Sequence, residues 1–191
     1  MKQFKYYAVF KPYDMLCQFT GQENDYLLGD LFDFPKDVYS IGRLDKDSEG
    51  LLLMTNDNRF KTKLLEPIYK TPKTYYAQVD GDITAEAIRE LSKGSIVIKH
   101  KGNSHKVAPA VCCKINDPNF PERSVPIRYR KNIPTSWVSI TISEGKNRQV
   151  RKMTAAAGFP TLRLVRFSIG NYKLGSMQPG DVVEIRPDQV L

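Results

Sequence analysis

Residues 41–55, IGRLDKDSEGLLLMT, combine a cluster of charges with an apolar run, and both the predicted sheet and the candidate chemistry depend on them. The first half of this stretch crowds charged residues against Gly50: Arg43, Asp45, Lys46, Asp47 and Glu49. Its second half, Leu51 to Met54, is continuously apolar, which is typical of a strand buried on both faces and indicates that the charges sit in an irregular loop before it. A carboxylate held there either pairs within a solvated turn, which composition alone favours, or faces a cleft as a catalytic candidate.

The overall composition is that of an ordinary soluble globular protein. The 191 residues are 41% hydrophobic and 26% charged,. Twenty-nine Lys and Arg against 21 Asp and Glu leave a net charge of +8. From Glu122 onward, twelve Lys or Arg residues face five Asp or Glu residues, so the surplus is concentrated in the second half. This balance favours a polyanionic partner, most simply nucleic acid, but does not by itself require one.

Several classes of site are excluded by the residues present. The three cysteines, Cys17, Cys112 and Cys113, form no disulfide framework, and we expect reduced thiols in a cytoplasmic protein,. The two histidines share no metal-like spacing with them,. Gly145-Lys146 lacks the upstream Gly and the following Ser or Thr of a P-loop,. The sequence shows neither a signal peptide nor a stretch as long as a membrane span.

Periodicity and turn residues predict strands alternating with helices. Strands are expected at 6–10, 51–54, 73–79, 137–142, 162–169 and 182–185, with a hairpin formed by 96–98 and 107–115,. Helices are expected at 27–32, ending before Pro35, and from a cap at Asn56 or Asp57 through Leu65,. Two more are expected from Thr84 through Leu91, ended by Gly94, and at 148–157,. The Pro-rich residues 116–134 should be irregular. The pattern predicts a mixed sheet protein in two lobes.

The helix expected at 148–157 is basic on one face. Arg148, Arg151 and Lys152 stand at spacings of three and four,. Arg163 and Arg166 follow on the next strand, and aromatic residues are interleaved with these charges. Guanidinium groups suit phosphates and aromatic rings stack on exposed bases, so RNA binding is one interpretation. A solvated helix face beside ordinary core aromatics is equally compatible with this pattern.

Three spaced motifs together resemble the RsuA/Rlu family of pseudouridine synthases. They are GRLD at 42–45 with SEGLLLMTND at 48–57, KTYYAQV at 73–79, and EGKNRQVRKM at 144–153. The segments PTSW at 134–137 and GFPTLRLVR at 158–166 make the chain most similar to the RluE type. The resemblance covers nearly the whole chain. Ser48 stands where many relatives carry Thr, which keeps the hydroxyl.

The resemblance implies a fold, an activity and a partner. The fold would be one catalytic domain over residues 1–191: an α+β structure with a mixed, mostly antiparallel sheet flanked by helices, in two lobes around a cleft, without an N-terminal S4-like domain. The activity would be isomerisation of a uridine in 23S ribosomal RNA to pseudouridine. The uracil leaves C1′ through N1 and rejoins through C5, so no cofactor or metal is required. A monomer acting on the large-subunit RNA, away from membranes, is expected.

The resemblance also assigns catalytic residues. Asp45 matches the catalytic carboxylate, which either attacks C1′ or takes a proton from C2′, and the sequence does not choose between these. Arg151 matches a basic residue that would offset the cost of burying that charge. Tyr75 matches a tyrosine that stacks on the uracil. Leu164 would close the pocket, and Gly50 would allow close backbone packing beneath the loop.

The remaining assignments concern RNA binding. Arg43 would hold RNA or the loop, or form an internal salt bridge. Extruding the target base costs roughly a few kcal/mol, which phosphate contacts would offset; the candidates are Arg148, Lys152, Arg163 and Arg166. Two alternatives are a non-catalytic RNA-binding ribosome-assembly protein and a tRNA pseudouridine synthase. The joint presence of Asp45, Tyr75 and Arg151 disfavours the first, and the RluE-like segments disfavour the second.

Overall fold

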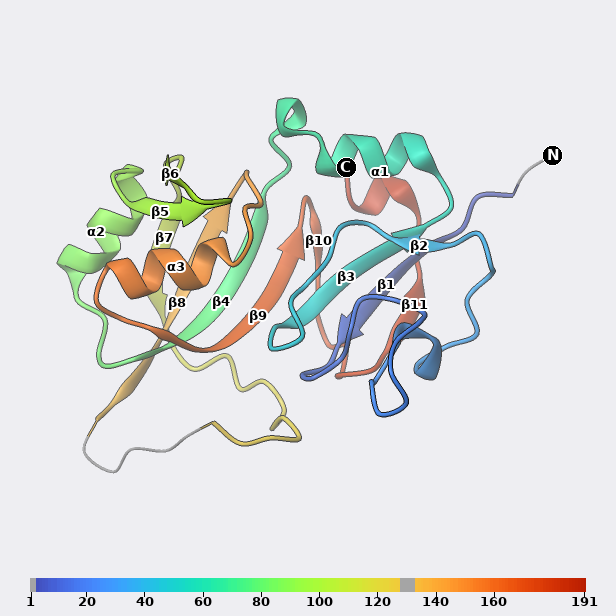
Figure 1. The fold of residues 1–191 in the computed structure, drawn as a ribbon, viewed down its shortest axis with the longest axis horizontal. Coiled ribbons are helices and arrows are strands. Elements are labelled where there is room, and N and C mark those ends of the chain that lie inside the picture. The colour runs from blue at the N-terminus through green and yellow to red at the C-terminus, as the bar shows by residue number, and fades with distance from the viewer. Residues whose placement is uncertain (1–2, 128–132) are drawn as a thin grey trace. The chain divides into compact units, whose positions relative to one another are not determined.

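The computed structural model describes residues 3–127 and 133–191. The chain forms two compact units (Figure 1). Unit 1 comprises Met1–Thr71 and Arg166–Leu191, and unit 2 comprises Pro72–Val165. The chain therefore leaves unit 1 after its first 71 residues, builds unit 2, and returns within strand β9 (Thr161–Ile169). Each unit is built around antiparallel strand pairs, which confirms the predicted α+β class.

Unit 1 is organised around the apolar run within residues 41–55. That run lies in β3 (Glu49–Thr55), whose seven residues are all buried. β3 pairs antiparallel with β1 (Tyr6–Lys11), and β1 pairs with β11 (Val182–Glu184). The last part of β9 lies on the other side of β3, and two short strands complete the sheet: β2 (Tyr39–Ser40) on β3 and β10 (Tyr172–Lys173) on β9.

The helix of unit 1 begins where the capping residue predicts. α1 (Asn58–Leu65) starts after Asp57, whose Oδ1 accepts hydrogen bonds from the backbone N–H groups of Arg59 (2.9 Å) and Phe60 (3.3 Å),. The helix ends at Leu65, with Glu66 as its C-cap before Pro67. Two short 3-10 turns follow elsewhere in this unit, η2 (Pro67–Tyr69) and η3 (Pro187–Gln189).

The helix predicted at 27–32 is wrong. Only a single 3-10 turn forms there, η1 (Leu28–Asp30). The Asp30 carboxylate accepts from the backbone N–H of Leu27 at 2.7 Å, a bond that caps the start of this single turn,. Phe32 and Phe34 pack on the ring of Tyr7 on β1, with centroids 5.7 and 5.4 Å away. Packing against the sheet therefore overrides the helical spacing.

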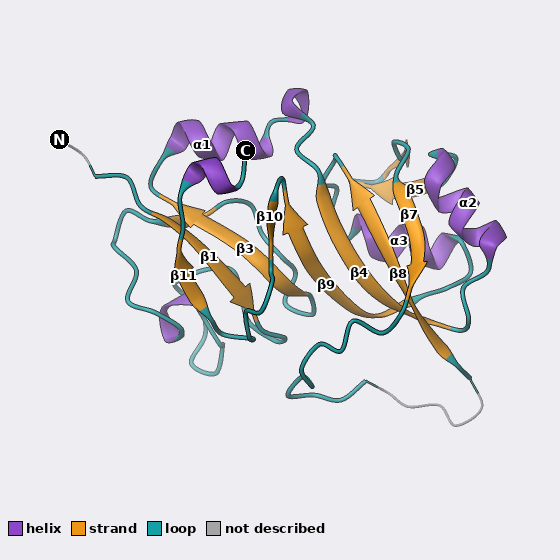
Figure 2. Ribbon diagram, turned by 180° about the vertical axis from the view of Figure 1, so that it is seen from behind, coloured by secondary structure: helices purple, strands orange, loops and turns teal. Residues whose placement is uncertain are grey.

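Unit 2 contains a second antiparallel arrangement with two helices. β4 (Lys73–Asp80) pairs along its whole length with β8 (Thr135–Ile142), β8 pairs with β7 (Val111–Ile115), and the first part of β9 lies next to β4. α2 (Ala85–Lys93) is capped by Thr84 and ended by Gly94 at φ 68°. α3 (Gln149–Ala156) covers one face of these strands, as the two opposite views show (Figures 1 and 2).

The predicted hairpin has its second arm in the wrong place. β5 (Val97–His100) pairs with β6 (Asn103–Lys106), while 111–115 becomes β7 and pairs with β8. The two residues between β5 and β6, Lys101 and Gly102, have φ of 49° and 81°, as a tight two-residue hairpin turn needs,. Closure at that turn leaves only four residues in each arm.

Candidate active site

Residues 41–48, which include the charged cluster around Asp45, form a loop between β2 and β3 in unit 1. The backbone N–H of Ile41 donates to the carbonyl of Leu53 at 2.7 Å, and that of Ser48 donates to the carbonyl of Asp45 at 3.0 Å. Asp45 is half-buried and Arg43 is exposed. The loop therefore returns on itself around Asp45, which fixes the backbone on either side of the carboxylate.

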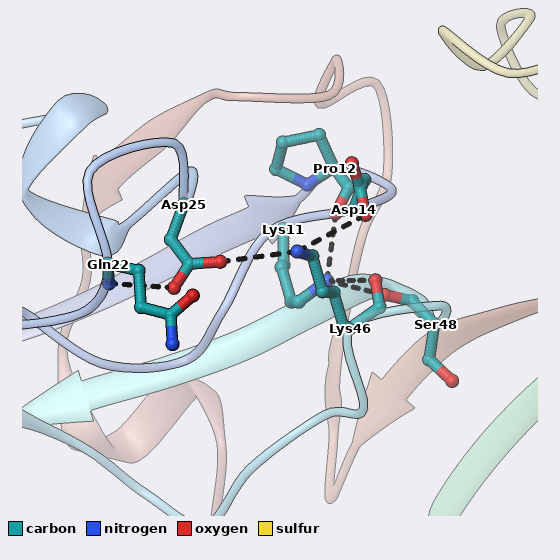
Figure 3. Close-up of polar contacts among 7 residues, drawn as sticks. All are labelled: Lys11, Pro12, Asp14, Gln22, Asp25, Lys46 and Ser48. Carbon is teal, nitrogen blue, oxygen red and sulfur yellow. Dashed lines mark hydrogen bonds and ion pairs between the residues drawn. The ribbon is translucent and has the colours of Figure 1, made fainter.

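A buried lysine, Lys11, donates hydrogen bonds to the backbone of this loop (Figure 3). The Lys11 ammonium, at the end of β1, donates to the carbonyl oxygens of Ser48 (2.7 Å), Pro12 (2.8 Å) and Lys46 (3.3 Å). The residue has no exposed surface, and burial lowers its pKa from 10.5 to about 8, against the opposing effect of nearby acidic groups. One cation thus satisfies two carbonyls of the loop that carries Asp45.

Further contacts hold the same loop. The backbone N–H of Leu44 donates to the Cys17 sulfur at 3.3 Å, and the thiol lies 3.3 Å from the Leu44 carbonyl. The backbone N–H of Asp14 donates to the carbonyl of Lys46 at 2.9 Å. The Lys46 ammonium lies 3.3 Å from a carboxylate oxygen of Asp25 and 3.7 Å from one of Asp14, as Figure 3 shows. The residues flanking Asp45 are therefore anchored on both sides.

The end of the loop packs directly against strand β9. Gly50 has φ of 106°, and a Cβ there would lie 2.4 Å from the carbonyl oxygen of Arg166 and 2.6 Å from its nitrogen. No side chain fits in this space, so the position needs glycine. The Arg166 Nε donates to the carbonyl of Leu51 at 2.7 Å, and only 4% of the residue is exposed.

In unit 2, two adjacent tyrosines occupy opposite faces of β4. Tyr75, opposite Ile140 in the ladder, is 9% exposed. Tyr76 is half-buried, and the centroid of its ring lies 6.1 Å from that of Phe120. Tyr75 is therefore the more enclosed of the two, while Tyr76 packs against the irregular segment after β7.

The basic residues of α3 are directed to different neighbours. Arg148 precedes the helix with φ of 52° and is exposed. Arg151 donates from Nη1 to the carbonyl of Thr161, at the start of β9, at 3.3 Å. Lys152 donates from Nζ to the carbonyl of Lys99 on β5 at 2.8 Å. Arg151 thus lies against the strand that also carries Leu164, which is buried at 5% exposure.

The strand arginines make contacts that stabilise their own units. Arg163 is 6% exposed, donates from Nη2 to the carbonyl of Pro121 at 2.8 Å, and lies over the ring of Phe120 at 5.8 Å. The same ring contacts the Trp137 ring at 5.9 Å. Arg166 serves β3 as described above. RNA binding by these two residues stays a prediction, and the contacts observed give each of them a structural role.

Sequence reasoning missed two residues that hold the loop from outside it, Lys11 and Cys17. Nothing local distinguishes either one, because their importance arises from pairing with backbone groups 37 and 27 positions away. A lysine that directly follows a fully apolar strand segment was the one available signal for Lys11.

Neither a metal-binding cluster nor a membrane-spanning helix is found among the described residues. Within residues 3–127 and 133–191, no three His, Cys, Asp or Glu side chains gather in a way that would hold a metal ion. Over the same ranges, every helix is too short or too polar to cross a bilayer. The catalytic candidates are divided between the units: Asp45, Arg43 and Gly50 belong to unit 1, and Tyr75, Arg151 and Leu164 to unit 2.

Comparisons with known proteins agree on one family. The family model described as RNA pseudouridylate synthase matches residues 5–156. Ribosomal large subunit pseudouridine synthase E of Vibrio parahaemolyticus is 49% identical over 176 residues, covering 92% of this chain and 71% of the relative. The protein of the same description from Xanthomonas campestris pv. campestris is 41% identical over 184 residues, covering 93% and 96%. A crystal structure described as a pseudouridylate synthase superposes with a TM-score of 0.77 at 23% identity, covering all of this chain and 74% of that one.

Proposed function

The chain belongs to the RNA pseudouridylate synthase family, and we propose that it converts a uridine of 23S ribosomal RNA into pseudouridine. The observation that carries the proposal is the similarity, over more than nine-tenths of the chain, to relatives described as large subunit pseudouridine synthase E. The reaction breaks the N1–C1′ bond, forms a C5–C1′ bond, and moves a proton from C5 to solvent while N1 gains one. The product is an isomer, so the atoms balance without a co-reactant.

Asp45 is the catalytic carboxylate of this proposal. The support is its position in the matching motif and the anchoring of its loop, which holds the backbone on both sides of the carboxylate. A reacting group must be held close to its productive geometry, because small displacements cost large factors in rate. Attack on C1′ and removal of the C2′ proton both begin from the ionised carboxylate, and either route suits this arrangement.

Two residues of unit 2 complete the proposed chemistry. Tyr75 stacks on the uracil while the base is detached, since a flat ring holds a base without preventing its rotation. Arg151 supplies the positive charge that keeps a carboxylate ionised when water is excluded. Leu164 provides apolar surface that closes the pocket. These roles rest on the motif match and on the enclosure of Tyr75 and Leu164 within their strands.

RNA binding falls to the exposed cations. Arg43 and Arg148 are exposed, and Lys152 lies with its ammonium at the edge of β5. Their phosphate contacts offset the few kcal/mol, in order of magnitude, that extruding a base requires. We propose that the protein acts in the cytoplasm as a monomer.

The test is release of tritium from C5-labelled uridine in a 23S rRNA transcript. Wild type should release tritium and Asp45→Asn should release none while binding the RNA equally well. Asp47→Asn is the matched control, since it removes a carboxylate two positions away in the same loop and should stay active. Release from a tRNA transcript but not from 23S rRNA would overturn the substrate, and binding without release from any RNA would overturn the reaction.

A further inference from the structure

Three lysines lie around His100 at the end of β5. Lys101 follows it in the chain, and the Lys152 ammonium donates to the carbonyl of the preceding Lys99 at 2.8 Å. Lys146 stands two residues after Glu144, which pairs with His105, and the His105 ring lies 6.3 Å from that of His100. The pKa of His100 is lowered by burial and then by the charges of Lys146, Lys101 and Lys152 and by His105. Two of these lysines come from the segment around α3 and one from the hairpin turn. We call His100, Lys101, Lys146 and Lys152 the hairpin patch. Figure 1 places β5 and β6 next to α3, in agreement with the contacts between α3 and β5.

The charge of the two contributing segments is strongly one-sided. Residues 97–106 contain three lysines, and residues 144–152 contain four Lys or Arg, so seven basic side chains accompany one acid, Glu144. That acid is engaged internally. Its carboxylate accepts from the Gln149 side chain (2.6 Å) and the backbone N–H of Ala108 (2.8 Å), and lies 3.1 Å from the His105 Nε2.

The pKa of Glu144 reflects this engagement. Burial opposes its ionisation, but the hydrogen bonds from Ala108, His105 and Gln149 outweigh that effect and hold the pKa below its usual value. The carboxylate is therefore charged, and its hydrogen bonds connect the end of β6 to the start of α3. Because the Glu144 carboxylate is directed at those partners, positive charge predominates among the side chains around His100.

The patch is held on a rigid support. Lys101 stands in the two-residue turn with φ of 49° and is exposed. Lys152 is fixed by its bond to the carbonyl of Lys99, which ties α3 to β5 at 2.8 Å. Like charges gathered in this way repel each other and cost stability, unless an anion binds among them. Phosphate groups spaced along a nucleic acid backbone match such a surface.

We infer that the hairpin patch binds the phosphate backbone of the RNA substrate, as a contact surface additional to the catalytic residues. The inference rests on the proposed function only for the identity of the RNA. It predicts sequence-independent affinity, since phosphate contacts position an RNA without reading its bases. Its partner is a single strand or stem of RNA that extends beyond the modified uridine.

The experiment compares two double variants with equal loss of charge. Lys101→Asn/Lys146→Gln removes two ammoniums from the patch, and Asn tolerates the left-handed conformation at position 101. Lys36→Gln/Lys173→Gln removes two exposed lysines from unit 1 as the control. Fluorescence anisotropy of a labelled 23S rRNA transcript, measured over a series of KCl concentrations, gives the affinity and its salt dependence. Thermal unfolding checks that each variant is folded, and Lys101→Asn alone replaces the double variant if that one is not.

The patch variant should bind roughly 10-fold more weakly, with the slope of log affinity against log salt reduced by about 1 for each lysine removed. The RNA concentration that half-saturates tritium release should rise in parallel. The control should keep the wild-type slope. An unchanged slope in a folded patch variant, or an equal loss in the control, would overturn the inference. A reduced slope without tritium release by wild type would instead reject the proposed reaction and leave the patch standing.

Discussion

Lys11 and Ser48 lie 37 positions apart, yet the ammonium of the first donates to the backbone carbonyl of the second at 2.7 Å. This bond joins the end of strand β1 to the end of the loop that carries Asp45. It is buried, so it does not compete with water, and its loss would leave a carbonyl without its partner. The geometry of the proposed catalytic loop therefore depends on a residue that has no part in the chemistry.

Replacing Lys11 by Met should lower the turnover of a protein that still folds. The side chain is of similar length but cannot donate to the three carbonyls, which costs about 1–3 kcal/mol after the relief of burying a charge. Urea unfolding measures this cost, and tritium release under conditions where the variant is folded measures the loss of turnover. Lys36→Met, at an exposed position, is the control. A folded Lys11→Met protein with wild-type turnover would contradict the anchoring role.

The same lysine should make stability depend on pH in the alkaline range. Its pKa is about 8 in the folded protein and 10.5 ordinarily, so between these values the unfolded chain binds more protons. As pH rises from 8 to 10.5, Lys11 therefore increases the free energy of unfolding by at most about 1.4 kcal/mol per pH unit,. This contribution disappears as pH falls back to 8,. The stability difference between wild type and Lys11→Met, followed by denaturation against pH, should shift in favour of wild type from pH 8 upward. A difference that stays flat across the window would refute the lowered pKa.

Cys17 should report on the integrity of the loop. Burial raises the pKa of its thiol, and the sulfur is engaged by the backbone of Leu44. Alkylation requires the exposed thiolate, so iodoacetamide should modify the exposed Cys113 well before Cys17,. Peptide mass spectrometry over time gives both rates in one sample. In Lys11→Met the Cys17 rate should increase while the Cys113 rate stays constant; equal rates for the two thiols in wild type would show that the loop is open.

Gly50→Ala should be strongly destabilising. The new methyl group would overlap the backbone of Arg166, and alanine disfavours φ of 106°, for a combined cost of about 3 kcal/mol or more,. Gly145→Ala is the control, because a Cβ there meets nothing within 4 Å. Chemical denaturation should show the first loss and a change within about 0.5 kcal/mol for the second. A Gly50→Ala protein as stable as wild type would mean that the two strands can move apart.

The sequence predicts most elements of this fold because their signals are local. Asp57 caps α1 and Gly94 ends α2 as their residue types indicate, and β3 follows from its apolar run. The failures have non-local causes. Phe32 and Phe34 pack on Tyr7 rather than along a helix, and the true end of the hairpin depends on the turn at Lys101. The irregular segment predicted at 116–134 lies partly outside the described residues.

In the candidate site, too, residues in local motifs can be predicted, and residues that depend on non-local contacts cannot. Asp45 and Tyr75 stand in motifs that can be recognised from the residues alone. The exposure of an arginine cannot be predicted this way, since it depends on what surrounds the strand: Arg163 and Arg166 have the same composition signal as Arg148 but are buried against carbonyls. Lys11 and Cys17 could not be linked to the loop before the chain was folded.

The packing of Phe120 gives the protein an internal optical probe. Trp137 is the single tryptophan of the chain, is 6% exposed, and touches the Phe120 ring at 5.9 Å. Release of that ring would admit water to the indole and shift its emission to longer wavelength. Intrinsic fluorescence of the unlabelled protein therefore follows whether the segment around Phe120 remains packed against β4 and β8, without any engineered chromophore.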